Sequence, residues 1–378
     1  MKVLVIDPSG KIPLYDYSLC NALCKEDLEL TFLSPCTKHQ ADTYDVSYRF
    51  KKLVKVPDGW NAAAQKILKP LIGLINYLYV IGIIGKRQYD VIHFQWLPFL
   101  EYFSIEWWFL SVYKTISPRS KFVLTQHNLY PHNSSLEAKK LYNKRMQAVK
   151  NKFDLFILHT ESSKEAFCKE FKVKENKVSV VYHGVFHPNT MPIRKSALIP
   201  KRILMFGIQS FYKGTDILID AVDLLSEDIR AKINVTIAGG TEDHLLIDKL
   251  PLAKKNGITW LPRYIEDDEL NQLIADSDVL VLPYRAISQS GVLLQSLPYK
   301  KHLLVSDLPS FRETLKGYPE DCFFRAGSSE SLAKSITDYI NDNVDFQKEK
   351  MANQYLIELY SWNMSAKKTV ELYKRLFD

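Results

Sequence analysis

The amino-acid sequence predicts an α/β protein made of two doubly wound domains with parallel sheets. The chain has 378 residues, a length that suits two domains of ordinary size. Short apolar runs alternate with stretches of helical period, which is typical of parallel sheets covered by helices on both faces. A proline-rich stretch without a clear period divides the runs into two series.

Eleven apolar runs are the predicted core strands. The first series lies at 2–6, 28–33, 91–94, 121–125, 155–159 and 178–182. The second series lies at 202–206, 233–238, 258–261, 279–283 and 303–306. The stretches between them are long enough for crossover helices. Domains of this kind bind ligands outside the carboxyl ends of their strands, so we expect site residues in the loops that follow the strands.

The division between the two series sets the predicted domain boundaries. We predict a Rossmann-like domain at 1–187, a linker at 188–201 and a second Rossmann-like domain at 202–355. Residues 356–378 are predicted to form a C-terminal helix that packs back towards the first domain. Two facing domains would place a binding site in the cleft between them.

Composition places the chain among ordinary globular proteins of a reducing compartment. Hydrophobic residues make up 46% and charged residues 25% of the sequence. The five cysteines are scattered and show no zinc-ligand spacing, which favours free thiols. The apolar run at the N-terminus is too short for a signal peptide and is interpreted as a first core strand. We therefore expect a cytoplasmic location.

The charge of the chain is uneven. Residues 1–190 hold 26 Lys and Arg against 17 Asp and Glu, whereas the remainder holds 24 against 26. A basic N-terminal half indicates an anionic partner such as a membrane surface, a nucleic acid or a phosphorylated acceptor. Nucleic acid is disfavoured, because the basic residues are scattered and no recognised binding module is present.

The segment at 61–87 admits three interpretations. No charged residue occurs between Lys69 and Lys86, a stretch of 16 residues. A bilayer span needs about 20 residues, and Pro70 and Gly73 weaken a spanning helix further. A buried domain helix and a helix that lies in a membrane interface remain as alternatives, and the flanking lysines favour the interfacial one over chance.

Two loops of the second series have the features of an anion site. The first follows the strand at 202–206, contains Lys213 and Gly214, and leads into a helical pattern. A helix N-terminus offers free N–H groups and the lysine offers a full charge, although the spacing is not that of a P-loop. An ordinary surface turn is the alternative for this loop taken alone.

The second loop follows the strand at 279–283 and includes Ser288, Gln289 and Ser290. Ser290 is a good N-cap, and Gly291 would let a phosphate approach the backbone amides of Gly291 and Val292. Two such loops, about 80 residues apart in one domain, suit a diphosphate held between them.

At this point the sequence resembles the family 4 retaining glycosyltransferases of the GT-B fold, also called glycosyl transferases group 1. The resemblance rests on motifs spread over most of the chain. In the second half these are Phe206-Gly207, Tyr212-Lys213-Gly214-Thr215-Asp216, Ala238-Gly239-Gly240, Arg263-Tyr264-Ile265, the run 275–284 and Ser288-Gln289-Ser290-Gly291-Val292. Less specific motifs in the first half are His93-Phe94-Gln95-Trp96, Thr125-Gln126-His127-Asn128, Pro131-His132 and His183-Gly184-Val185.

The resemblance implies a role for each matching residue. Lys213 and His127 would be the catalytic residues, with Lys213 on the donor diphosphate and His127 beside the transferred sugar, where it positions the sugar without acting as a nucleophile. His183 and Asn128 would face the acceptor and the cleft. The implied donor-binding residues are Gly10, Arg263, Tyr264, Arg285, Ser288, Gln289, Ser290, Gly291, Val292 and Gln295.

Three positions depart from the family pattern. The family places two glutamates eight positions apart in the second loop and its helix, where this chain has Ile287 and Gln295. An amide can still hydrogen-bond ribose hydroxyls, but Ile287 cannot. The family often has an arginine where this chain has Ile208, and Arg285 is a candidate to replace that cation.

No metal or other cofactor is expected. Lys213 and helix N-termini would stabilise the leaving group without a metal. Asp276-Ser277-Asp278 spells a metal-binding pattern, but it precedes a core strand, on the wrong side for a ligand. A nicotinamide dehydrogenase is disfavoured, because no G-x-G-x-x-G follows a predicted strand.

We therefore expect a retaining hexosyltransferase. It would move a hexosyl unit from a UDP- or GDP-sugar to a glycan or a lipid-linked saccharide, in bacterial surface polysaccharide synthesis and at the inner face of the membrane. The pattern leaves two alternatives open, a catalytically silent GT-B binding protein and a nucleotide-sugar epimerase of similar fold.

Overall fold

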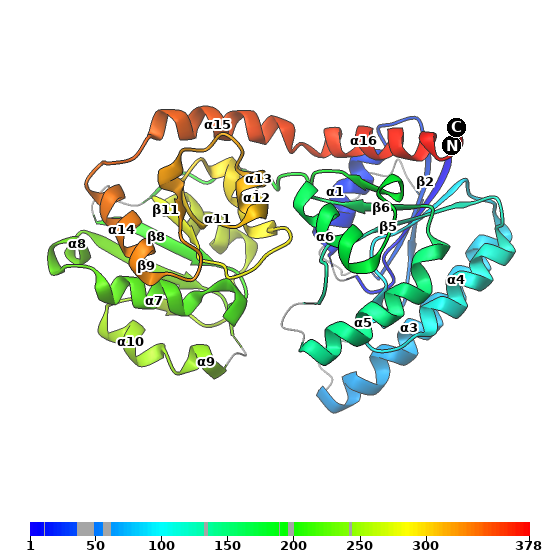
Figure 1. Cartoon of the computed structure of the whole chain (residues 1–378), viewed down its shortest axis with the longest axis horizontal. Coiled ribbons are helices and arrows are strands. Elements are labelled where there is room, and N and C mark those ends of the chain that lie inside the picture. Colours follow the sequence, from blue (N-terminus) through cyan, green and yellow to red (C-terminus); the bar gives the residue numbers. More distant parts are fainter. Residues whose placement is uncertain are drawn as a thin grey trace. The chain divides into compact units, whose positions relative to one another are not determined.

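The computed structural model describes most of the chain as two compact units. Described are residues 1–10, 12–35, 49–55, 62–131, 135–188, 190–195, 200–241 and 244–378, without the side chains of 62–67 and 244–245. Unit 1 comprises Met1–Gly184 and Ser361–Asp378, and unit 2 comprises Val185–Tyr360 (Figure 1). Residues 189 and 196–199 of the predicted linker, together with Cys36 and His132, lie outside the described residues.

Unit 1 contains a parallel sheet of seven strands in the order β3-β2-β1-β4-β5-β6-β7. The strands are β1 (Lys2–Ile6), β2 (Glu29–Ser34), β3 (Arg49–Lys52), β4 (Val91–Phe94), β5 (Lys121–Thr125), β6 (Leu155–Leu158) and β7 (Val178–Val180). Every pair of neighbours is parallel, so all the strands end at one edge of the sheet. Loops after strands far apart in sequence therefore meet there.

Helices cover both faces of this sheet. They are α1 (Pro13–Leu23), α3 (Ala62–Lys86), α4 (Ile105–Ile116), α5 (Leu136–Val149), α6 (Glu161–Phe171) and α16 (Trp362–Arg375), with 3-10 turns η1 (Pro98–Glu101), η2 (Lys150–Lys152) and η3 (Glu175–Lys177). α1 and α16 pack on the face that carries Val3 and Val5. The other four helices pack on the face that carries Leu4 and Ile6.

The last helix belongs to unit 1 although it follows unit 2 in sequence. α16 lies beside α1, and its Tyr373 hydroxyl hydrogen-bonds Nδ1 of His93 at 2.5 Å. The Ser365 hydroxyl donates to the carbonyl of Tyr182 at 2.6 Å. Burial of Ala366, Val370 and Tyr373 against the sheet completes the core on that face.

Unit 2 contains a parallel sheet of six strands in the order β10-β9-β8-β11-β12-β13. Its strands are β8 (Lys201–Phe206), β9 (Ile233–Ala238), β10 (Thr259–Leu261), β11 (Val279–Leu282), β12 (His302–Ser306) and β13 (Phe323–Phe324). Its helices are α7 (Thr215–Leu224), α8 (Glu227–Ala231), α9 (His244–Ile247), α10 (Leu250–Lys255), α11 (Asp267–Asp276), α12 (Gly291–Ser296), α13 (Pro309–Thr314), α14 (Ser329–Ile340) and α15 (Phe346–Leu359), with turns η4 (Phe211–Lys213), η5 (Leu297–Tyr299) and η6 (Glu320–Cys322).

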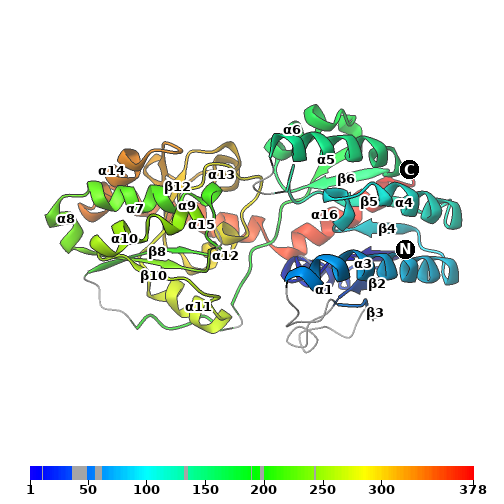
Figure 2. The same cartoon turned by 90° about the horizontal axis from the view of Figure 1, so that it is seen from below.

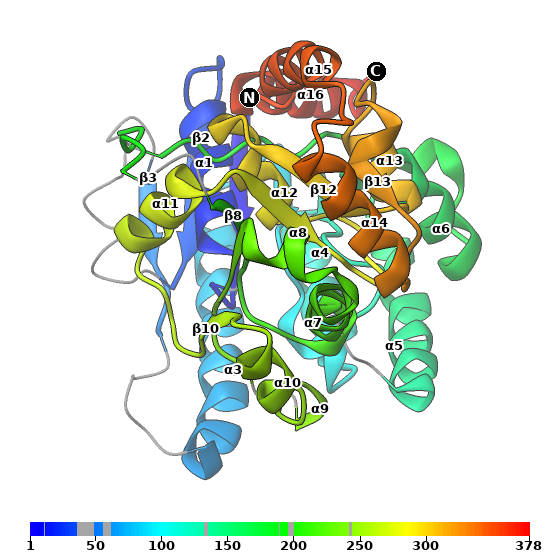
Figure 3. The same cartoon turned by 90° about the vertical axis from the view of Figure 1, so that its left-hand side faces the viewer.

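One face of the second sheet is covered by α7, α8, α10 and α14, whose apolar residues form a single core with the strands. α7 and α14 lie side by side (Figure 3). α11 lies on the opposite side of the sheet from α7 and α10 (Figure 2). Helices on both faces leave the strand ends as the open edge, where ligand contacts are expected.

The predicted fold class is confirmed, and each of the eleven predicted strands overlaps an observed one. Two observed strands were not predicted, β3 and β13. β3 lies at the edge of its sheet and has the sequence RFKK, which contains no apolar run from which a strand could be predicted. β13 contains only two residues, which is too short for any periodicity.

Candidate functional site

Three glycine-containing backbone segments pack directly on one another at the carboxyl edge of the second sheet. Gly214 has a φ of 71°, and a Cβ placed there would lie 1.9 Å from the carbonyl oxygen of Pro283. Gly239 has a φ of 135°, and its Cβ would lie 2.1 Å from the Gly207 carbonyl oxygen. Only glycine fits at these two positions, so the loops after β8, β9 and β11 form one close assembly.

Lys213 lies in this assembly as a buried cation. Only 8% of its surface is exposed, and no carboxylate pairs with its Nζ among the side chains described. Nζ lies 5.8 Å from the centre of the Tyr284 ring and would be 2.8 Å from a Cβ on Gly207. Burial lowers the pKa of the Lys213 ammonium to about 8. A buried charge without a partner is unfavourable, so this one is suited to bind an anion.

The second predicted loop lies against the same glycine. Val292 has Cγ2 at 3.3 Å from the position of a Cβ on Gly207, so Lys213 and Val292 flank one point of the backbone. The Ser290 side chain caps α12 by accepting from the Leu293 N–H at 3.1 Å. Gly291 is exposed, with no atom within 4 Å of an added Cβ. Its backbone is therefore open to an approaching ligand.

The other residues of this loop are half-buried around the α12 N-terminus. The Gln289 side-chain oxygen accepts from the Ser290 N–H at 3.3 Å. Gln295 lies one turn further along α12 than Gly291. The backbone carbonyl of Ile287 accepts from the Ser310 hydroxyl at 2.9 Å. Ser288 and Ile287 both keep part of their surface exposed.

Arg285 has a different position from the one expected of a second donor-site cation. Its guanidinium makes a two-bond ion pair with Asp216, at 2.8 and 2.6 Å, and donates to the Phe211 carbonyl at 2.7 Å. It also stacks on the Phe211 ring at 4.0 Å. The charge of Arg285 is thus neutralised by Asp216, and the side chain holds the turn that carries Lys213.

The residues assigned to the nucleotide base are exposed. Arg263 pairs with Glu269 through two hydrogen bonds of 2.8 and 2.6 Å, and Tyr264 is 73% exposed. Arg263 follows β10, and its backbone lies 3.9 Å from an added Cβ on Gly240. Ile208, in the position where the family often has arginine, is 76% exposed.

In unit 1, residues after consecutive strands form a row of histidines. The Val181 carbonyl interacts with Nδ1 of His159 at 2.9 Å, and Nε2 of His159 lies 3.1 Å from Nδ1 of His127. A carbonyl can only accept, so Nδ1 of His159 carries its proton and Nε2 accepts from His127. His127 is then protonated on Nδ1. Its Nε2 is buried.

Burial keeps these imidazoles neutral. It lowers the pKa of His159 to about 4, and burial together with the neighbouring His159 lowers the pKa of His93 and of His183 to about 3. Burial first, and then the neighbouring histidines, hold the pKa of His127 well below its usual range. Neutral imidazoles hydrogen-bond a sugar hydroxyl without adding positive charge.

A pocket opens beside His127. The Trp96 ring is stacked with the His127 ring at 5.9 Å between centres. Leu97, Glu101 and Tyr130 also line the pocket. Asn128 is half-buried in its wall, and its backbone carbonyl accepts from the Gln126 amide at 2.5 Å. An aromatic face with nearby polar groups suits a sugar ring.

Gly10 and His183 occupy different surroundings in unit 1. Gly10 has a φ of 61°, and an added Cβ would lie 3.1 Å from Pro35. His183 is buried, with Nδ1 at 2.6 Å from the Gly184 carbonyl oxygen and its ring packed on Tyr15 and Trp362. His183 therefore joins the histidine row from the last strand of the sheet.

The two halves of the chain match two descriptions of one enzyme group. Residues 15–186 match Glycosyltransferase Family 4, and residues 200–342 match Glycosyl transferases group 1. The chain belongs to glycosyltransferase family 4. Its two parallel sheets with helices on both faces are those of the GT-B fold.

Among curated proteins, this glycosyltransferase is similar to two named relatives. An uncharacterized glycosyltransferase of Methanocaldococcus jannaschii is 26% identical over 232 residues, which cover 58% of this chain and 59% of the relative. A GDP-mannose:glycolipid 4-beta-D-mannosyltransferase of Xanthomonas campestris pv. campestris is 26% identical over 124 residues, 33% of this chain and 35% of the relative. The matches thus span about three-fifths of the first relative and about a third of the second.

Solved structures share the fold over the whole chain. Sucrose-phosphate synthase from Thermosynechococcus elongatus has a TM-score of 0.71 at 16% identity and covers 100% of this chain and 98% of its own. HepE of Anabaena in complex with UDP has a TM-score of 0.67 at 16% identity, and the match covers 99% of this chain and 100% of HepE. At such identities the likeness shows the fold alone.

Several site-adjacent residues of this glycosyltransferase were missed in the sequence. Tyr15 of α1 packs on three rings of the row, with centre distances of 4.6 Å to His127, 5.3 Å to His159 and 4.8 Å to His183. His159 is the residue that fixes the protonation of His127. The sequence signal that could have revealed these contacts is that polar residues occur at the carboxyl ends of several predicted strands, which meet at one edge of the sheet.

Buried carboxylates under α1 were also missed. Asp7 follows β1, and Asp16 lies on α1 with both carboxylate oxygens buried. Burial and the neighbouring Asp7 raise the pKa of Asp16 well above its usual range. Burial thus disfavours the ionised form of Asp16.

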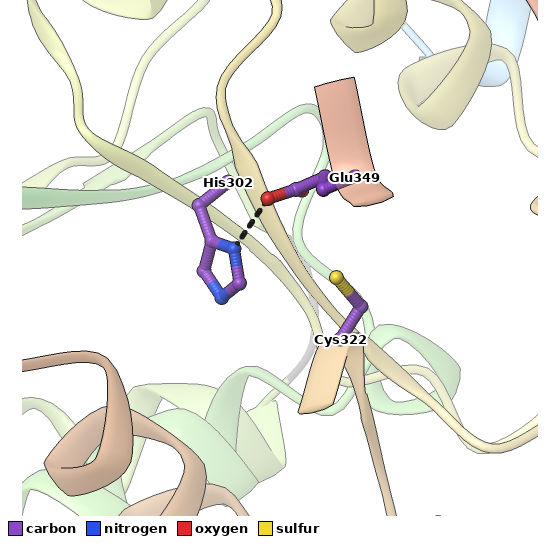
Figure 4. A group of neighbouring side chains, drawn as sticks. All are labelled: His302, Cys322 and Glu349. Atoms are coloured by element: carbon purple, nitrogen blue, oxygen red, sulfur yellow. Dashed lines mark hydrogen bonds and ion pairs between the residues drawn. The ribbon is translucent and has the colours of Figure 1, made fainter. Parts of the chain in front are cut away.

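One group of convergent side chains in the described residues has the types that bind metals, and it lies outside the loops above. His302, Cys322 and Glu349 are buried, with ligand atoms within 4.8 Å of one another (Figure 4). Glu349 accepts from His302 Nδ1 at 2.8 Å and from the Leu303 N–H at 3.0 Å. Burial raises the pKa of the Cys322 thiol. Hydrogen bonds already engage Nδ1 and both carboxylate oxygens, so the cluster is explained as a link between β12, η6 and α15.

The Asp276-Ser277-Asp278 pattern is likewise engaged in structural contacts. Asp278 accepts from Arg194 at 2.8 Å and from the Arg202 N–H at 2.9 Å. Asp276 accepts from the Lys195 N–H at 2.6 Å. These carboxylates fix the segment before β8 to the start of β11.

Proposed function

We propose that this chain is an active retaining glycosyltransferase that moves a hexosyl unit from a UDP- or GDP-sugar to a glycan or lipid-linked saccharide. The observation that carries the proposal is Lys213 beside Gly207 and Val292, a buried cation for which the described side chains offer no carboxylate partner. A nucleoside diphosphate is an anion that would complete this site. Surface polysaccharide synthesis in a bacterium, on the cytoplasmic side of the membrane, is the proposed setting.

In the proposed mechanism the protein stabilises the departing diphosphate. Negative charge grows on the leaving phosphate, where the Lys213 ammonium and the amides of Gly291 and Val292 would lower its energy. Arg285 would act indirectly, because it holds the Lys213 turn through Asp216. No metal is needed in this scheme, so a chelator is expected to leave turnover unchanged.

His127 would orient the transferred sugar. The Trp96 and His127 rings would lie against the sugar, while His159 holds Nδ1 of His127 in place. The acceptor hydroxyl would attack on the face that the leaving group departs from, with a phosphate oxygen taking its proton. The carboxylate pair used in glycoside hydrolysis has no part in this scheme.

The two candidate donors are supported by different relatives. HepE of Anabaena was solved with UDP and with UDP-glucose. The Xanthomonas campestris relative is named for GDP-mannose and a glycolipid acceptor. The exposed Arg263 and Tyr264, after β10, are proposed to contact the base and so to decide between uracil and guanine.

The test has two steps. Thermal unfolding is measured with UDP, GDP, ADP and TDP, and the nucleotide that matches the site is expected to raise the unfolding temperature. Diphosphate release from the corresponding sugars is then measured for the wild type, Lys213→Ala and the exposed control Lys255→Ala. We expect a loss of about 100-fold or more in kcat/KM for Lys213→Ala alone. No shift with any nucleotide, or equal activity in Lys213→Ala, would overturn the proposal.

A catalytically silent binding protein is the second candidate, favoured by one observation. Ile208 is 76% exposed and Ile287 is partly exposed, so apolar side chains stand where family members have charged ones. Under this alternative a nucleotide raises the unfolding temperature, yet no sugar nucleotide in either series is turned over. Detectable release that depends on Lys213 excludes it.

A further inference from the structure

We propose that unit 1 docks on an anionic lipid bilayer through the exposed face of α3 together with the exposed aromatic residues of α4 and of the segment between η1 and α4, with α3 lying in the plane of the interface. The proposal rests on the proposed function where it takes the acceptor to be carried by a lipid. We call this surface the α3–α4 face. It comprises Leu71, Ile75, Leu78, Tyr79, Tyr102, Phe103, Trp107, Trp108 and Ile116.

The outward side of α3 is apolar over more than two turns. Leu71, Ile75, Leu78 and Tyr79 are between 45% and 52% exposed. Their spacing of four, three and one residues places them on one side of a helix. No charged residue interrupts this side, since positions 70–85 carry none. A helix on a protein surface normally turns polar side chains to water, so this face is matched to an apolar environment.

The inward side of α3 shows that the helix does not cross a bilayer by itself. Leu68–Lys86 has the length and composition of a span, but a third of that window is buried inside the protein. The Tyr77 ring lies 4.7 Å from Phe109, and the Tyr113 hydroxyl donates to the Tyr77 carbonyl at 2.8 Å. A helix surrounded by lipid could not keep these contacts. One apolar side on the core and one exposed describe a helix that lies in an interface.

The neighbouring elements extend the face with aromatic side chains. α3 and α4 lie side by side (Figures 1 and 2). An added Cβ on Gly85 would lie 3.9 Å from Ile116 of α4. Trp107 and Trp108 are 48% and 50% exposed, and Tyr102 and Phe103 still more so. Tryptophan and tyrosine concentrate at membrane–water interfaces, where the ring meets the headgroups.

Charge indicates which lipids fit. Lys69 and Lys86 are exposed at the two ends of the apolar side of α3, and Lys152 lies 5.3 Å from the Trp107 ring. Residues 1–190 also carry nine more basic than acidic residues. Lysines near a bilayer surface each add about 1 kcal/mol of attraction to anionic lipids. A neutral bilayer would lack this contribution.

The α3–α4 face and the pocket beside His127 share one turn of chain. Leu97, just before η1, and Glu101, at its end, line the pocket, and Phe99 of η1 packs against α3 so tightly that a Cβ on Gly73 would lie 2.5 Å from the ring. A bilayer on this face would lie next to the pocket. A saccharide carried by a membrane lipid is therefore the acceptor class that this arrangement fits.

The test uses the full chain and vesicles, without any donor. The wild type is floated with vesicles of phosphatidylcholine alone and with vesicles that contain phosphatidylglycerol. It is compared with Ile75→Glu/Leu78→Glu, with Lys69→Glu/Lys86→Glu and with the exposed control Met351→Glu of unit 2. We expect flotation with the anionic vesicles, and a loss of about tenfold or more for the two α3 variants alone.

Two further measurements separate the outcomes. Each variant is checked for its thermal shift with UDP and GDP, which depends on unit 2 and shows that the chain is folded. Transfer to a soluble acceptor is expected to be unchanged in Ile75→Glu/Leu78→Glu, so a failure of the proposed function would be seen separately.

Equal flotation of the wild type and this variant, or no flotation of either, overturns the proposal. Membrane material that resists carbonate extraction overturns the in-plane arrangement, and a dimer abolished by Ile75→Glu/Leu78→Glu without vesicle binding assigns the face to a second copy.

Discussion

The two sheets end in edges with opposite chemistry. The edge of unit 1 is lined by histidines whose pKa values are lowered by burial, so its polar groups are neutral and joined by hydrogen bonds. The edge of unit 2 has a buried ammonium, that of Lys213, set among glycines. A neutral, hydrogen-bonding edge suits sugars, whereas a lone cation with an open backbone suits a phosphate. One fold used twice thus provides two kinds of binding edge.

The edges also differ in what keeps them in place. The edge of unit 1 is held by side chains, through the contacts from Val181 to His159 and from His159 to His127. The edge of unit 2 is held by backbone in close contact, at Gly214 and Gly239. We therefore expect acid to damage the first edge and added side-chain volume to damage the second.

The largest effect is expected for Gly214→Ala. The new Cβ would lie 1.9 Å from the Pro283 carbonyl oxygen, in a residue with a φ of 71°, so the loops after β8 and β11 must separate. We expect the free energy of unfolding to fall by about 3 kcal/mol or more. Denaturant unfolding measures it. Gly257→Ala is the matched control, because Gly257 has a φ of 68° but no atom within 4 Å of an added Cβ.

Gly257→Ala is expected to cost only about 1 kcal/mol, the cost of the left-handed conformation. Equal losses in the two variants would mean that the backbone conformation, and not the close approach of the loops, is what requires glycine at position 214.

How far the sequence predicts this molecule depends on the range of the interactions. The central strands were predicted because buried parallel strands are continuous apolar runs. Lys213 and Gly214 were predicted to belong to an anion site because the strand, the loop and the helix that form it are contiguous in the sequence. The ion pair of Arg285 with Asp216 was not, since it joins residues 69 positions apart. The histidine row escaped prediction for the same reason, because the strand order brings His159 beside His127.

Acidification is expected to weaken the histidine row of unit 1, whereas Glu106 and Asp16, whose pKa values are raised by burial, change the stability of the unit in the opposite direction. An unfolded histidine has a pKa of about 6.5, whereas His93, His159 and His183 have folded pKa values of about 3, 4 and 3. Between these values the unfolded chain binds more protons, so stability is full above about pH 6.5 and falls as the pH drops below it. Each group removes up to about 1.4 kcal/mol per pH unit.

Hydrogen exchange followed from about pH 7.5 to about pH 5.5 locates this loss. We expect the amides next to the histidine row to lose protection. His183→Gln should flatten this pH dependence, and His187→Gln, a change at an exposed histidine, should not. Earlier loss of protection at the loops around Lys213 than at the histidine row would contradict the contrast between the two edges.

Lys213→Met is expected to stabilise the ligand-free protein. Burial lowers the pKa of the ammonium from 10.5 to about 8, and this shift corresponds to about 3 kcal/mol that the charge costs at neutral pH. The cost is present below about pH 8 and disappears as the pH rises towards the unfolded pKa. We expect about 1–3 kcal/mol more stability in the variant and an affinity for the nucleoside diphosphate about 100-fold lower.

Denaturant unfolding and thermal shifts with UDP or GDP measure the two parts of this prediction. A gain in stability with a loss of affinity is the signature of a charge kept for a ligand. A variant that is less stable than the wild type would show that Lys213 has a structural role, and Lys255→Met serves as the exposed control.

The smallest effect is expected at the buried cluster of His302, Cys322 and Glu349, which lies outside both edges. Glu349→Gln keeps an acceptor but cannot serve both His302 and the Leu303 N–H as an anion does. We expect the free energy of unfolding to fall by about 1–2 kcal/mol with the nucleotide thermal shift unchanged, and no loss in the exposed control Glu358→Gln.

If a chelator lowers the stability of the wild type by as much as the substitution does, the cluster holds a metal ion. Insensitivity to chelator together with the expected loss leaves hydrogen bonding as its role, and a change in nucleotide affinity would mean that the support for the donor edge extends through β12 to α15.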